Sequence, residues 1–207
     1  MRRLWVLFLT VILAGTDTGL LEASQEDGQL RAGLIARYSV GDRFVERIDA
    51  EMAFDWGTSA PDPRLPTGGF RAAWQGQLLI RQPGQYRLHV FLEGRVRVLL
   101  DGREVLTASA ATASWHSGES CELTFGERAL RVEFTRTGPR ARLMLCWSSK
   151  EFPLEPVPAH LLFRSAPRSD LDKIELGRQL FASHRCNRCH QRTNDPPALP
   201  GPDLTAA

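Results

Sequence analysis

The feature that most constrains the fold is an alternation of apolar and polar residues, which recurs from residue 33 to residue 147. The segment FRAAWQGQLLI (70–80) places its large apolar side chains on one face of an extended chain. The segment RVRVLLDGREVL (95–106) alternates in the same way on both sides of Asp101-Gly102, a pair that suits the left-handed turn of a hairpin. Many short strands separated by turn signals predict an antiparallel β-sandwich rather than βαβ units.

The N-terminus has the layout of a secretory signal peptide. Arg2 and Arg3 precede the apolar run LWVLFLTVILA (4–14), and the small and polar residues that follow offer cleavage after Ala23. The alternative is an uncleaved anchor, but this run is short for a bilayer span of about 20 residues. We therefore expect residues 1–23 to be removed and the protein to be exported, to the periplasm or the cell surface.

The order of several segments resembles the protective-antigen-type (PA-fourteen) β-sandwich, which occurs in bacterial toxins, glycosidases and adhesins. The matching segments are GLIARY (33–38), FDW (54–56), FRAAWQGQL (70–78), PGQYRLHV (83–90), VRVLLDGREV (96–105), VEFTRTGPRARLMLCW (132–147) and EPVPAHLLF (155–163). The resemblance implies one mainly β domain over residues 30–164.

The character of the sequence changes after this domain. Residues 165–170 are polar and include a proline, which predicts a short linker. In the segment that follows, Ile174, Leu180 and Phe181 recur at helical spacing. We expect a helix that leads into Cys186.

The run CNRCH holds Cys186, Cys189 and His190, and three interpretations compete. The cysteines could attach a haem c covalently, with His190 binding the iron. The run could bind zinc, but zinc sites usually need a second pair of ligands, and no Cys or His follows His190. It could be a redox dithiol, but that motif belongs between a strand and a helix, whereas this one follows a predicted helix. Haem attachment is favoured.

The flanking segment LGRQLFASHRCNRCH (176–190) resembles the start of a class I cytochrome c, as does the loop GPDL that contains Pro202. The resemblance implies that the Pro202 carbonyl accepts a hydrogen bond from the His190 ring and orients that ligand. No methionine stands in this segment to act as the usual distal ligand. The resemblance therefore implies a short, apparently truncated all-α cytochrome c segment over residues 171–207.

These resemblances imply an exported c-type cytochrome that carries electrons to a redox partner protein, with the sandwich as a docking or binding module. One alternative is a carbohydrate or cell-surface binding module with a vestigial haem segment. Another is the haem subunit of a larger dehydrogenase. No Ser-His-Asp, paired-carboxylate or phosphate-loop pattern stands out, so the chain itself is not expected to be an enzyme.

Some PA-fourteen sandwiches bind sugars through a calcium ion held by two consecutive aspartates. At that place this chain has Leu92-Glu93-Gly94, which leaves one carboxylate, so calcium is not expected. A net charge of +2 without a basic cluster does not support nucleic-acid binding. Strand parity places Cys121 and Cys146 on different faces, which favours two free thiols over a disulfide.

Overall fold

A computed structural model of the chain describes residues 30–164, 169–184 and 186. Every strand pairing in these ranges is antiparallel, as the alternating pattern predicts. The strands are β1 (Arg31–Ala32), β2 (Leu34–Val40), β3 (Arg43–Asp49), β4 (Ala53–Gly57), β5 (Arg71–Ile80), β6 (Gly84–Leu100), β7 (Arg103–Leu123), β8 (Gly126–Thr135), β9 (Ala141–Ser149), β10 (Glu155–Pro156) and β11 (Leu162–Arg164). A 3₁₀ turn η1 (Ala159–Leu161) and one α-helix, α1 (Ser169–Ser183), complete the described elements.

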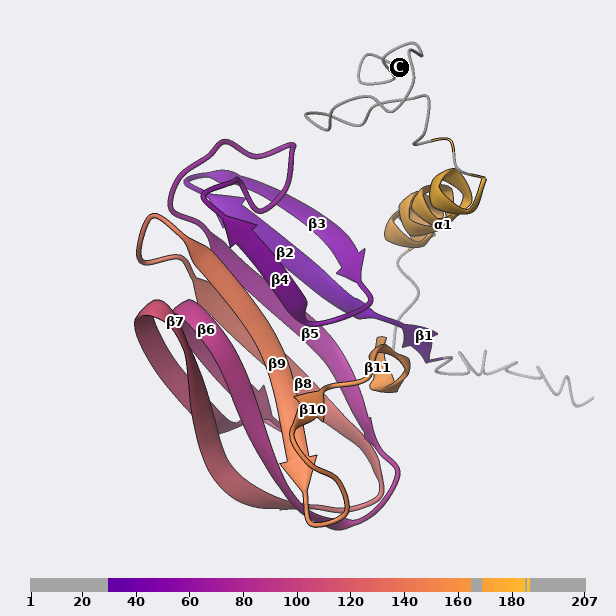
Figure 1. Cartoon of the computed structure of the whole chain (residues 1–207). Coiled ribbons are helices and arrows are strands. Elements are labelled where there is room, and N and C mark those ends of the chain that lie inside the picture. The colour runs from indigo at the N-terminus through magenta and orange to yellow at the C-terminus, as the bar shows by residue number, and fades with distance from the viewer. Residues whose placement is uncertain (1–29, 165–168, 185, 187–207) are drawn as a thin grey trace, which may run out of the picture.

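The strands form two layers that face each other across the core (Figure 1). In the first layer β3, β2, β5 and β8 pair in that order, and β8 then pairs with the second half of β6. In the second layer one edge of β9 pairs with the first half of β6, and the other edge pairs with β4 and β10 in turn. Strand β7 follows β6 along its length, so the β6–β7 hairpin belongs to both layers. The mainly β sandwich is thus confirmed.

Gly94 is the point at which β6 passes from one layer to the other. Before it β6 pairs with β9, and after it β6 pairs with β8. Gly94 has a φ of 138°, and a Cβ atom there would lie 2.6 Å from the Phe134 ring. Only glycine adopts this φ readily and also lacks the Cβ atom that would clash with Phe134. The Asp101-Gly102 turn is also confirmed, with φ values of 50° and 78°.

Aromatic side chains fill one end of the core. Phe54 of β4 stacks on Trp74 of β5 with ring centroids 5.2 Å apart, and Trp56 of β4 lies 5.1 Å from Phe134 of β8. Since β4 is not paired with β5 or β8, these contacts join the two layers. The alternating residues of β5 and β6 that the sequence assigns to the inner faces are buried.

A polar network lies against this aromatic cluster. The Asp49 carboxylate accepts hydrogen bonds from Tyr38 Oη (2.5 Å), Trp74 Nε1 (2.8 Å) and Arg47 Nε (2.7 Å). Arg47 also donates to Asp62 Oδ2 at 3.2 Å, and so joins β3 to the loop before β5. Because each buried charge has an opposite partner, the network holds β2, β3 and β5 together without an uncompensated charge.

Helix α1 packs against β3, and Asp172 forms an ion pair with the buried Arg164. The predicted all-α cytochrome c segment is not supported. In the described ranges α1 is the single α-helix, and Ile174, Leu176 and Leu180 are 49, 56 and 48% exposed. A packed all-α domain would cover such side chains with further helices. In the part of the chain that the structure describes, no helix has the length and apolar character that a bilayer crossing needs.

Candidate functional site

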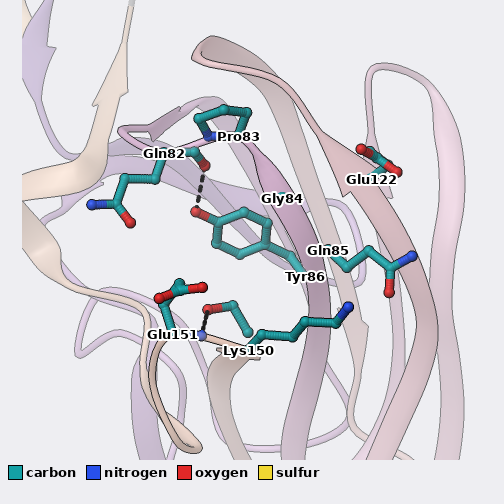
Figure 2. Close-up of a pocket in the computed structure, with 9 residues that line it drawn as sticks. Gln82, Pro83, Gly84, Gln85, Tyr86, Glu122, Lys150 and Glu151 are labelled. Carbon is teal, nitrogen blue, oxygen red and sulfur yellow. Dashed lines mark hydrogen bonds between the residues drawn. The ribbon is translucent and has the colours of Figure 1, made fainter.

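A pocket of about 280 Å³ opens at the end of the second layer, where β6 begins and β9 ends (Figure 2). The turn between β5 and β6, the end of β7 and the loop after β9 form its walls. Most of its lining side chains are polar: Gln82, Gln85, Glu122, Ser149, Lys150 and Glu151. Segments that are far apart in the sequence therefore line the same pocket.

Tyr86 stands at the centre of the pocket and holds the surrounding turn in place. Its hydroxyl donates a hydrogen bond to the Gln82 carbonyl at 2.7 Å. Its ring lies 5.4 Å from that of Trp147 and 6.0 Å from that of Phe152, and burial raises the pKa of the phenol. This packing makes the pocket floor a fixed surface rather than a loose loop.

The polar groups of the rim approach the pocket from two sides. Figure 2 shows the Gln85 and Lys150 side chains extending to one side of the Tyr86 ring, with Gln82 and Glu151 on the other. Among the residues that the structure describes, no hydrogen bond or ion pair engages the side chains of Gln85, Glu122 or Lys150. Their donors and acceptors are therefore available to a ligand.

The chemistry of this rim suits a polyhydroxylated ligand. An amide offers both a donor and an acceptor, a carboxylate accepts, and an ammonium group donates, so together they can bind several hydroxyl groups. The charged side chains that line the pocket are one base, Lys150, and two acids, Glu122 and Glu151, so charges of both signs are present and a strongly charged ligand is not selected. The Tyr86 ring adds an aromatic surface to this largely polar pocket, against which the apolar side of a polyhydroxylated ligand can pack.

The residues assigned to cofactor binding lie elsewhere. Cys186 has a partly buried, free thiol just beyond α1. Cys189, His190 and Pro202 lie outside the described residues, so the grouping of these four stays a prediction. Within the described ranges, no group of three or more His, Cys, Asp or Glu side chains could hold a metal ion.

Three sandwich residues named from the sequence, Glu93, Cys121 and Cys146, are either paired or buried within the protein. The Glu93 carboxylate lies 3.9 Å from Arg140 Nε, which gives it a cation within the protein. Cys121 and Cys146 are buried and free, as strand parity predicts. Burial raises the pKa of both thiols, that of Cys146 to about 11, so neither is a reactive thiolate at neutral pH.

Sequence reasoning missed the pocket because its residues carry no motif. The segment RQPGQY (81–86) has the proline and glycine of a turn, and nothing in it points to Lys150 or Glu122. Strand pairing brings these residues together. Gln85 lies opposite Glu122 on β7, and Tyr86 lies opposite Ser149 on β9.

Comparisons with known proteins agree with this architecture. A family model described as PA14 domain matches residues 26–154. The anti-sigma-I factor RsgI3 of Acetivibrio thermocellus is 30% identical over 138 residues, which cover 63% of this chain and 21% of that protein. The chain thus spans about a fifth of the length of this curated relative.

Two solved structures extend the comparison. An anti-sigma factor domain-containing protein shares 29% identity at a TM-score of 0.58, over 64% of this chain and 48% of that one. A PA14 sugar-binding domain from an RTX adhesin shares 15% identity at a TM-score of 0.53, over 64% of this chain and 98% of that one. The second likeness, at this low identity, concerns the fold alone.

These matches overturn the prediction of haem c binding and electron transfer. The relatives are anti-sigma factor proteins and a sugar-binding domain, not cytochromes, and the matched family covers the sandwich rather than the CNRCH run. The assignments of a haem cofactor, of iron and of electron transfer to a redox partner protein are therefore corrected. The binding-module alternative agrees better with the relatives.

Proposed function

The chain belongs to the PA14 domain family, and on this premise we propose that its sandwich is a carbohydrate-binding module of an exported protein. The pocket around Tyr86 is the binding site. The observation that carries the proposal is the set of unpaired polar side chains, Gln85, Glu122 and Lys150, among the described residues that line this hollow. The proposed module extends over residues 30–164, behind a signal peptide at 1–23.

The relatives support the ligand class. The adhesin domain with this fold is described as sugar-binding, and adhesins act at cell surfaces. The two anti-sigma factor relatives share the sandwich, but this chain spans only 21% of one and 48% of the other. We therefore assign to this chain the recognition of a glycan outside the cytoplasm.

Binding to immobilised glycans tests the proposal. The mature chain, passed over a glycan array and insoluble polysaccharides, is expected to be retained by at least one neutral glycan. Lys150→Ala is expected to weaken that binding about tenfold, since it removes a charged hydrogen-bond donor. Lys173→Ala is the matched control, because Lys173 is an exposed lysine on α1.

Two outcomes would contradict the proposal. In the first, no glycan retains the folded chain. In the second, a glycan binds but Lys150→Ala and Lys173→Ala have equal affinity, which would move the site away from the pocket.

A further inference from the structure

A row of outward-facing side chains leads from the pocket along β6. Alternate residues of this strand point away from the core, beginning at Gln85 in the pocket wall and ending at Glu93. The row is therefore roughly 26 Å long at the usual rise of an extended strand. Its members are Gln85, Arg87, His89, Phe91 and Glu93. The row continues beyond the pocket lining, which ends at Tyr86 on this strand, and its length suits a chain rather than a single small molecule.

The far part of the row carries an exposed aromatic pair. Phe91 lies opposite Trp115 of β7, with ring centroids 5.2 Å apart and ring planes at 49°. Trp115 is 49% exposed, although large aromatic side chains usually bury more of their surface. The Arg142 guanidinium covers Phe91 at 5.6 Å and leaves the Trp115 ring open. Such a ring can stack on the C–H face of a sugar.

The middle of the row offers hydrogen-bonding groups from three strands. His89 Nδ1 lies 2.8 Å from Ser117 Oγ of β7, and His89 Nε2 lies 2.9 Å from Ser148 Oγ of β9. Burial and the nearby charge of Arg87 lower the pKa of His89, so the imidazole is neutral at neutral pH. Because both ring nitrogens are engaged, the Ser117 and Ser148 hydroxyl groups carry the hydrogen-bonding capacity that remains for a ligand.

The charges at the end of the row are paired within the protein. Arg142 forms an ion pair with Asp55 of β4, and Glu93 lies near Arg140. The pocket end contains Lys150 and Arg87, but also Glu122 and Glu151. Because positive and negative side chains balance along the row, the surface favours a neutral polymer over a polyanion.

We propose that a neutral polysaccharide chain lies along the outer face of β6, from the pocket to the Phe91–Trp115 pair. The inference rests on the proposed function, and adds that the ligand is an extended polymer. Pocket and row form one continuous surface, because Gln85 belongs to both and its partner on β7, Glu122, also lines the pocket. The site is thus a strip of the sheet surface with a polar start, a polar middle and an aromatic end.

The test compares long and short forms of the neutral glycan found on the array. Calorimetric titration of the mature chain is expected to give an affinity at least tenfold higher for an oligosaccharide of six or more sugars than for a disaccharide. Trp115→Ala is expected to weaken only the long ligand, roughly fivefold to tenfold, since it removes one stacking contact. Trp115→Phe is expected to restore part of the loss.

Phe44→Ala is the matched control, because Phe44 is 54% exposed on β3, in the other layer. Circular dichroism confirms that each variant is folded. Equal affinity for long and short ligands, with Trp115→Ala indistinguishable from Phe44→Ala, would overturn the inference while leaving the pocket intact. Stronger binding of a polyanionic polysaccharide than of the neutral one would also overturn it. Failure of every glycan to bind would instead refute the proposed function.

Discussion

Asp62 shows how a single residue secures the loop that precedes β5. Burial alone would raise the pKa of its carboxyl group, but hydrogen bonds from Arg64 and the charges of Arg64 and Arg47 lower it to about 2. The Arg64 Nε–Asp62 Oδ1 distance is 2.8 Å, and the Asp62 side chain is only 5% exposed. The ionised form of Asp62 therefore stabilises the folded state.

This stabilisation predicts a loss of stability in acid. The pKa of Asp62 is lower in the folded chain than its ordinary value of 3.8, so its contribution is complete above pH 4 and disappears as the pH falls towards 2. The expected loss is about 2 kcal/mol. Urea unfolding at pH 5 and pH 2.5 measures it. Asp62→Asn should lower the stability at pH 5 and reduce the acid-dependent loss.

The exposed Asp42 supplies the control, since Asp42→Asn should leave both stabilities near those of the wild type. An Asp62→Asn variant that loses as much stability between the two pH values as the wild type would show that Asp62 does not contribute.

At the scale of elements, the shape of the sandwich depends on the passage of β6 between layers. Gly94→Ala is expected to lower the free energy of unfolding by about 2 kcal/mol or more, because the added Cβ meets the Phe134 ring at a positive φ. Thermal and urea unfolding measure the effect. Gly69→Ala is the control, since a Cβ there has no neighbour within 4 Å. Equal stability of Gly94→Ala and Gly69→Ala would contradict the claim that β6 needs glycine at position 94 to pass between the layers.

The sequence predicts which side chains of a strand are buried, but it does not predict which strands lie next to each other. Alternation determines which side chains of β5 and β6 are buried, because a strand has only two faces. It does not show which strands pair, so it could not bring Gln85 beside Glu122 or Tyr38 beside Asp49. The pocket could not be predicted for that reason: its walls come from residues whose proximity only the tertiary fold creates.

At the scale of the whole molecule, a short motif proved a weaker guide to function than the domain that precedes it. The CNRCH run, its flanking segment 176–190 and the GPDL loop predict a cytochrome, but such short segments form no fold by themselves. The sandwich covers most of the described chain, matches a family over residues 26–154, and contains the pocket. We therefore assign the function to the sandwich.

Mapping by nuclear magnetic resonance tests the central claim that the pocket binds a glycan. The isotope-labelled mature chain is titrated with a neutral glycan that it retains on the array. We expect the amide shifts to change first and most strongly at residues 82–86, at Glu122 and at 149–151, with smaller changes along β6. Changes confined to β3 and α1, with none at these positions, would contradict the account.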